Sequence, residues 1–158
     1  MPVTVPATMA DAVHVGDHMA PEDRLEWSCV HPGGSPLDDC IEAVLTADGN
    51  PTRYRLRTVR TPEGEPLVLG GWDVTLGVAW FALTTNAKRH RFLVYRAVRE
   101  CLNEALKECP YLMNVVMRSN KSHVRLLEGL GAEFVGPITT IAGEPFQSFV
   151  IHKEVTNV

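Results

Sequence analysis

Three basic side chains follow directly on a long apolar segment, and this is the clearest pattern in the sequence that could do chemistry. Lys88, Arg89 and Arg91 stand between the apolar residues 76–85 and an amphipathic helical pattern. Lys and Arg bind phosphate through charge-assisted hydrogen bonds, and the N-terminus of a helix favours an anion. Cations at that end oppose the helix dipole, which favours a binding role. The pattern leaves two interpretations open, an anion site or a solvated first turn.

Other reactive side chains form weaker patterns. Cys29, His31 and Cys40 fit no common zinc spacing and have no evident fourth ligand, so we expect no metal site. The sequence contains neither a Gly-x-Ser-x-Gly elbow nor a P-loop. No two cysteines form a Cys-x-x-Cys pair, and we expect reduced thiols in a cytosol, with Cys101 and Cys109 packed in the core.

The composition indicates one domain over residues 1–158. A formal net charge of −4 argues against nucleic acid as the main partner, because phosphate-binding domains usually carry a basic excess. No segment reaches the roughly 20 apolar residues that span a bilayer, so we expect no membrane segment. The first residues lack the basic and apolar runs of a secretory signal.

The first third of the chain reads as a short strand followed by helices. We expect a strand over Val3–Val5, a helix of about ten residues capped by Thr8, and a helix opened by Pro21. Residues 37–47 predict a third helix, or a helix running into a strand, which residues 48–51 (DGNP) terminate.

A meander of three strands is expected next. Arg53, Arg55 and Arg57 alternate with less polar residues, which indicates a half-exposed strand whose basic face meets solvent or an acidic partner. Residues 67–71 follow as a second strand. Residues 76–85 (LGVAWFALTT) are nearly all apolar and uncharged, which is typical of a central strand buried on both faces.

The last third alternates helices and strands and sets the fold class. The spacing predicts an α/β order of elements. Its expected elements are a helix over 94–109, a strand over 112–117, a helix over 122–130, and a hairpin of strands 133–141 and 146–153.

Two segments carry a resemblance to a known family. Residues 115–134 (VVMRSNKSHVRLLEGLGAEF) place an Asn after a strand, then a helix with paired apolar residues, then a Leu-Gly step. Residues 80–91 run an aromatic strand into a basic helix start. With the order of elements, these segments resemble the GNAT (Gcn5-related acetyltransferase) fold. The resemblance implies an α/β domain with a mixed, mainly antiparallel sheet and helices on both faces. Over residues 72–153 the chain also resembles the internal virion (core) protein A family of short-tailed phages.

The resemblance implies a site for acetyl-CoA. In GNAT proteins the pantetheine arm lies where two neighbouring parallel strands splay, here residues 76–85 and 112–117, and the pyrophosphate lies on the next helix N-terminus. The family's glycine-rich phosphate loop falls on residues 85–92, which contain no glycine. The implied cofactor residues are Leu83, Thr85, Lys88, Arg89, Arg91 and Asn120. For Asn120, capping of the following helix is a sufficient alternative.

The resemblance also implies where catalytic groups should stand. Leu127 takes the position of the family's Tyr general acid and cannot donate a proton. His123, one turn earlier, is the substitute catalytic candidate, with Ser122 as a weaker hydrogen-bond donor. The alternative for His123 is a helix-start residue that faces solvent. Asp73 is the carboxylate that stands just before the central strand.

Two functions follow from these expectations. The first is a phage-encoded acyl-CoA-dependent N-acetyltransferase, or a degenerate relative that retains CoA binding. The second is a non-catalytic GNAT-fold protein that acts by contact with phage virion proteins or a bacterial host protein. Either would place it in the host cytoplasm or in the virion.

Overall fold

Capping side chains or prolines begin the helices of the first third of the chain. The computed structural model describes residues 4–152, so the predicted strand and hairpin ends at Val3 and Lys153 lie outside it. Strand β1 (Thr4–Pro6) leads to α1 (Met9–His18), where Thr8 forms a capping box with Asp11. Helices α2 (Pro21–Val30) and α3 (Pro36–Gly49) each begin with proline at N1. Helix α3 continues to Gly49, so the helical reading of residues 37–47 is confirmed and the strand reading is wrong.

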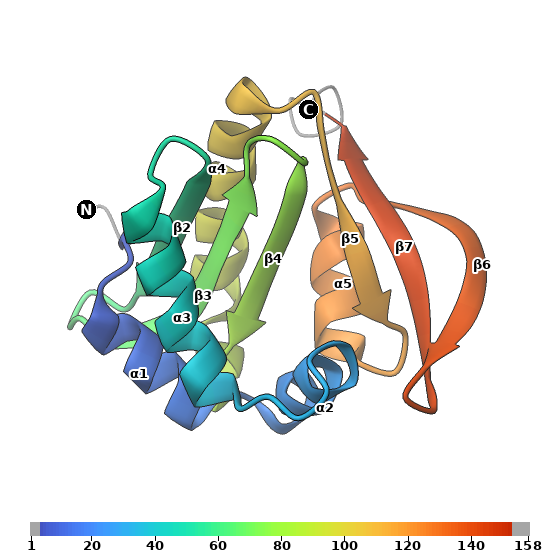
Figure 1. Cartoon of the computed structure of the whole chain (residues 1–158), viewed down its shortest axis with the longest axis horizontal. Helices are drawn as coiled ribbons and strands as arrows, with labels where there is room; N and C mark the ends of the chain where they lie inside the picture. The colour runs from blue at the N-terminus through green and yellow to red at the C-terminus, as the bar shows by residue number, and fades with distance from the viewer. Residues whose placement is uncertain (1–3, 153–158) are drawn as a thin grey trace.

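The strands form one mixed sheet, and two of them diverge. Strands β2 (Tyr54–Arg60), β3 (Pro66–Asp73), β4 (Val78–Leu83), β5 (Tyr111–Met117), β6 (Glu133–Ile141) and β7 (Glu144–His152) join β1 in the order β1-β2-β3-β4-β5-β7-β6. Among the described strands, β4 and β5 make the parallel pair and the other neighbours are antiparallel. The β4–β5 ladder includes a single register pair, Val78 with Met113. The gap between β4 and β5 opens from there, as Figure 1 shows.

Asn114 marks the point where the ladder stops. Its amide Nδ2 donates to the carbonyl of Ala79 at 2.8 Å, and its Oδ1 accepts the backbone N–H of Val115 at 2.8 Å. A side chain thus takes the place of the next backbone partner. This keeps β5 away from the C-terminal half of β4.

Helices cover both faces of the sheet. A 3₁₀ turn η1 (Thr85–His90) leads into α4 (Arg91–Glu108), which lies behind the sheet in Figure 1, while α3 lies in front. The apolar stripe of α4 and part of α5 (Lys121–Gly129) pack on one face, and α1 and α3 pack on the other. Cys109 is buried in the core as expected, whereas Cys101 is half-buried. No described helix is long and apolar enough to cross a membrane.

The expected burial of the central strand is wrong in its first two-thirds. Residues 78–81 are half-buried, Leu76 is exposed in the preceding turn, and Thr85 is exposed in η1. Ala82 and Leu83 alone in the strand are buried. The physical reason is that residues 78–81 line an open cavity, whereas Leu83 is covered by the residues that join α1 to α2.

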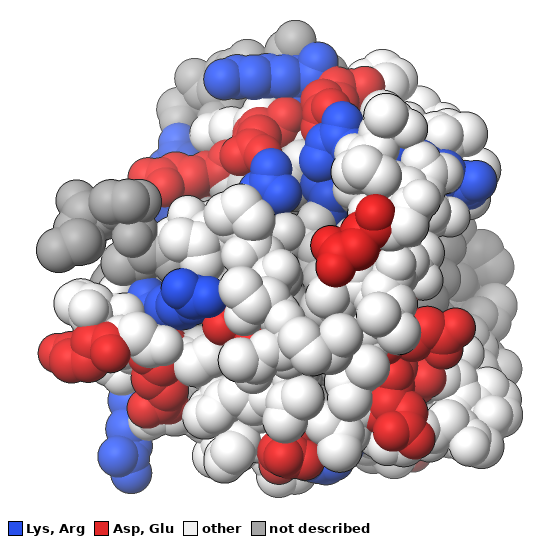
Figure 2. All heavy atoms as spheres, turned by 60° about the vertical axis from the view of Figure 1, so that its left-hand side comes forward, with Lys and Arg blue, Asp and Glu red and all other residues white. Residues whose placement is uncertain are grey.

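The basic face of β2 is paired within the chain and is not a free surface. Arg53 binds Asp73 with Nη2–Oδ2 at 2.9 Å, and Arg55 binds Glu108 of α4 at 2.7 Å. Arg57 pairs with Glu104 of α4 and lies over the Trp72 ring. Figure 2 shows basic and acidic side chains side by side in the upper part of this view. The arginines of β2 therefore neither form the solvated face nor await the acidic partner that the sequence led us to expect, because carboxylates of the same chain already pair with them.

The close packing of β2 on β3 makes Gly71 a test of the fold. A Cβ at Gly71 would lie 2.2 Å from the carbonyl oxygen of Arg55. We expect Gly71→Ala to lower the free energy of unfolding by about 1–3 kcal/mol, since backbone must move. Urea titration measures this. Gly49→Ala is the matched control, because a Cβ there meets nothing within 4 Å. Equal stability of both variants would contradict the described β2–β3 packing.

Candidate functional site

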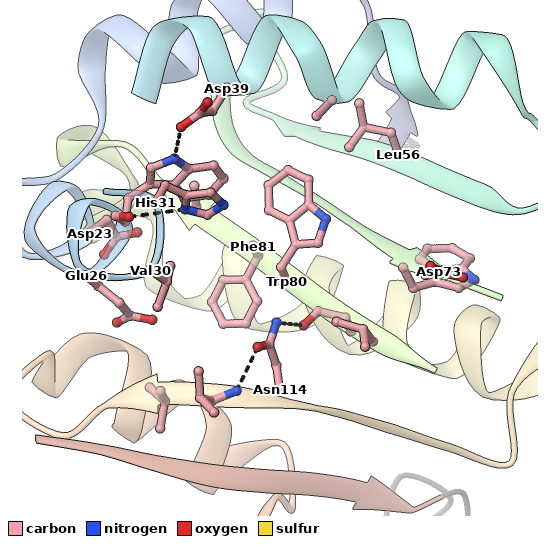
Figure 3. A pocket seen from close by; sticks show the side chains of 18 of the residues that line it. Asp23, Glu26, Val30, His31, Asp39, Leu56, Asp73, Trp80, Phe81 and Asn114 are labelled. Atoms are coloured by element: carbon pink, nitrogen blue, oxygen red, sulfur yellow. Dashed lines mark hydrogen bonds between the residues drawn. The ribbon is translucent and has the colours of Figure 1, made fainter. Parts of the chain in front are cut away.

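A cavity of about 640 Å³ opens where β4 and β5 diverge. It lies between the sheet and helices α2 and α3, and its walls are largely apolar. Trp80 and Phe81 project into it from β4, with Asp23 and Glu26 at one end (Figure 3). Asp39 accepts the indole N–H of Trp27 at 2.8 Å, which holds α3 against α2 at the rim.

The edge of β4 beside this cavity is occupied by the chain itself. The backbone N–H of Ala20 donates to the carbonyl of Leu83 at 2.9 Å, and Met19 forms an isolated bridge with Thr84. The backbone N–H of Leu83 donates to Asp23 Oδ2 at 2.6 Å. Both main-chain groups of Leu83 therefore bind the junction of α1 and α2.

A buried polar cluster surrounds that carboxylate. His123 Nε2 lies 2.9 Å from Asp23 Oδ2, and His123 Nδ1 lies 3.6 Å from Glu26 Oε1. The Asn120 amide donates to Asp23 Oδ1 at 3.1 Å and to Glu26 Oε1 at 2.9 Å. These contacts tie α2 to the start of α5. They are charge-assisted and enclosed, so each is stronger than a neutral hydrogen bond.

His123 is buried, so the expectation that it faces solvent is wrong. The residue is 5% exposed, and its ring lies against Phe81 with centroids 4.6 Å apart. Burial lowers the pKa of His123, but the charges and hydrogen bonds of Asp23 and Glu26 outweigh burial and raise that pKa to about 10. His123 is therefore an imidazolium at neutral pH, held by two carboxylates.

Asn120 caps α5 while it joins the cluster. Its Oδ1 accepts the backbone N–H of His123 at 3.5 Å, as the capping interpretation predicts, and its amide hydrogens go to Asp23 and Glu26. Asn120 is fully buried. Ser122, next along the helix, is half-buried.

The basic segment forms a tight turn. Ala87 N–H donates to the carbonyl of Thr84 at 3.1 Å within η1. Lys88 Nζ lies 3.1 Å from Glu22 Oε1 of α2. Arg89 and Arg91 are exposed and have no ion-pair partner among residues 4–152. Arg89 and Arg91 are available to an anion, whereas Lys88 is paired with Glu22. The open glycine loop that brings backbone N–H groups to a phosphate is replaced by a 3₁₀ turn.

The residues at the candidate acid and base positions are poorly suited to proton transfer. Leu127, at the position of the expected Tyr, is buried. Asp73 lines the cavity, but the hydrogen bond from Arg53 lowers the pKa of Asp73, with backbone N–H donors from Thr75 and Leu76 adding to it. A carboxylate held this way is a poor base.

Solved structures share this fold. The chain is similar to a spermidine N-acetyltransferase from Vibrio cholerae in complex with CoA and spermine, with a TM-score of 0.72, 13% identity, and coverage of 98% of this chain and 97% of that one. It is also similar to AAC(6')-Ib in complex with ribostamycin and coenzyme A, with a TM-score of 0.70, 16% identity, and coverage of 98% and 95%. The architecture is therefore the GNAT fold.

The sequence itself defines a narrower family. The profile of the family described as "Bacteriophage T7, probable scaffold protein Gp13" matches residues 59–139, just over half of the chain. The chain belongs to this family. No curated protein matches the sequence.

The residues at the splay do not fit acetyl-CoA in the way the GNAT resemblance implies. The groups of Leu83 that would face pantetheine bind Ala20 and Asp23, and Asn120 is engaged by Asp23 and Glu26. The binding roles inferred for Leu83, Thr85, Lys88, Arg89, Arg91 and Asn120, and the catalytic roles inferred for Ser122 and His123, stay predictions.

Sequence reasoning missed Asp23 and Glu26. Asp23 was visible only as an acidic residue in the first turn of a helix, where the dipole explains it. Glu26, one turn later, has no local pattern of its own. Asp23 lies 97 positions from Asn120 and 100 from His123. No local pattern links residues so far apart in the chain.

The raised pKa of His123 predicts a pH-dependent stability. A pKa near 6.5 in the unfolded chain and about 10 in the folded chain means that the folded state binds the extra proton between these values. This stabilisation is complete below pH 6.5 and is lost as pH rises toward 10, at up to about 1.4 kcal/mol per pH unit.

Urea titrations of the wild type and His123→Gln between pH 6 and about 10 measure this effect. We expect the stability advantage of the wild type to shrink as pH rises. His152→Gln is the matched control and should leave the pH profile unchanged. A wild-type advantage that is constant over this range would contradict a charged His123.

Proposed function

We propose that this chain is a phage-encoded GNAT-fold protein that does not catalyse acetyl transfer and acts by protein–protein contact in virion assembly. The observation that carries the proposal is the occupied edge of β4. Asp23 and Ala20 bind the main-chain groups of Leu83 that a pantetheine arm would need. A ligand would have to displace a buried charge from several partners, which is costly.

Three further observations support this function. The phosphate-loop position lacks glycine and forms a 3₁₀ turn. Leu127 replaces the proton donor and is buried. The family is described as a probable scaffold protein, which is an assembly role. The likeness to the internal virion protein family fits the same role and a location in the host cytoplasm or the virion.

The second candidate function is retained acetyl-CoA binding. The cavity of about 640 Å³ at the splay favours it, together with the exposed Arg89 and Arg91 near the C-terminal end of β4. Similar solved structures hold CoA. On this reading the protein keeps a binding site while its catalytic groups are lost.

Calorimetric titration with acetyl-CoA separates the two functions. For the assembly function we expect no binding heat up to millimolar acetyl-CoA, because the Leu83 edge is closed. Micromolar binding, about −8 kcal/mol, that is lost in Lys88→Ala/Arg89→Ala/Arg91→Ala would contradict it. The matched control removes exposed cations elsewhere, in Lys107→Ala/Lys121→Ala.

Capture experiments then identify the partner. Tagged protein incubated with lysate from phage-infected bacteria should retain phage structural proteins. Lysate from uninfected bacteria is the control. Retention of the same bacterial protein from both lysates, without phage proteins, would contradict assembly and indicate a host target.

A further inference from the structure

Phe92 is an unusual surface residue. It is 83% exposed at the start of α4, on a well-formed helix. Arg89, Arg91 and Arg96 surround it in sequence, are exposed, and have no ion-pair partner among residues 4–152. An aromatic ring with arginines around it is the kind of group that anchors protein interfaces.

The charge of this part of the chain is one-sided. Residues 74–99 hold five of the 15 basic residues and none of the 19 acidic ones. The rest of the chain therefore carries ten basic against 19 acidic residues. A protein with separate basic and acidic regions can attract a second copy of itself.

The cavity has the opposite character. Its apolar lining includes Trp27, Val30, Trp80 and Phe81. Carboxylates also line it, from Asp23, Glu26, Asp39, Glu42 and Asp73, together with the cations of Arg55 and His123. Within the chain, Asp23 pairs with His123, Asp73 pairs with Arg53, and Asp39 accepts the Trp27 indole N–H. Among these, Glu42 is exposed, and its carboxylate has no ion-pair partner among residues 4–152. An aromatic side chain would pack on the apolar lining of this cavity, and guanidinium groups beside it would pair with the exposed carboxylate of Glu42.

The size of the cavity also suits one side chain and its neighbours. Ligand pockets of about 300–1,000 Å³ enclose drug-sized molecules, and this cavity measures about 640 Å³. Phe92 is exposed and does not line the cavity of its own chain. Helix α4 lies behind the sheet, whereas α3, which walls the cavity, lies in front (Figure 1).

We infer that Phe92 of one copy inserts into the cavity between α2, α3 and the sheet of a second copy, with Arg89, Arg91 and Arg96 facing the exposed carboxylate of Glu42. Two different surfaces meet, so the contact is heterologous, and repeating it gives a ring or an open chain. The inference rests on the proposed function in that assembly by protein contact needs an interface. It names the partner, a second copy of this chain.

Sedimentation velocity of the purified chain tests this contact directly. The wild type should associate as its concentration rises, and added salt should weaken association because exposed charges are screened. Phe92→Asp removes the inserted ring, and Val30→Arg places a cation in the cavity wall at an exposed helix position. Each variant alone should associate at least about tenfold more weakly.

Mixing the two variants gives the decisive result. Phe92→Asp keeps an intact cavity, and Val30→Arg keeps an intact Phe92, so an equimolar mixture should form a one-to-one dimer that grows no further. Leu45→Asp is the matched control, since Leu45 is 58% exposed on α3 and does not line the cavity. It should associate like the wild type.

Three outcomes would overturn the inference: a monomeric wild type at all concentrations, a mixture that stays monomeric, or loss of association in Leu45→Asp alone. Circular dichroism of each variant shows whether it is folded, and Phe92→Leu offers a milder change if Phe92→Asp is not. Acetyl-CoA binding is measured separately, so the proposed assembly function and this contact can fail independently.

Discussion

The carboxylate of Asp23 is the interaction on which the site depends. It is buried, and it accepts hydrogen bonds from the backbone of Leu83, the amide of Asn120 and the ring of His123. A buried charge is tolerated only when it is paired and hydrogen-bonded. Loss of any one partner leaves the others enclosed without compensation. The carboxylate therefore joins α2, β4 and α5 into one unit.

This arrangement decides which backbone groups of β4 remain free in the gap between β4 and β5. Asn114 ends the parallel ladder and opens the gap, as in a fold built to receive a ligand between strands. The junction of α1 and α2 then binds the free edge of β4 through Ala20 and Asp23. What remains is a cavity whose walls include Trp27, Trp80 and Phe81. The same fold can host different functions because its site is set by such local contacts.

The fold was predictable from the sequence because its signals are local. Proline and capping residues mark the helix starts, and alternation marks β2. The site was predictable only in part. Asn120 was found because a helix cap has a local pattern, whereas the burial of His123 depends on Asp23, which is 100 positions away. The half-exposure of β4 was missed because an apolar run does not report whether a neighbouring strand lies beside it.

Hydrogen exchange at the Leu83 amide, followed by NMR with and without millimolar acetyl-CoA, tests the closed edge most directly. Leu69, buried in the middle of β3, provides the internal reference. We expect the Leu83 amide to be protected to the same extent as that of Leu69, and neither its exchange rate nor its chemical shift to change with acetyl-CoA. Rapid exchange of the Leu83 amide, or a shift on adding acetyl-CoA, would show that Asp23 does not hold this edge.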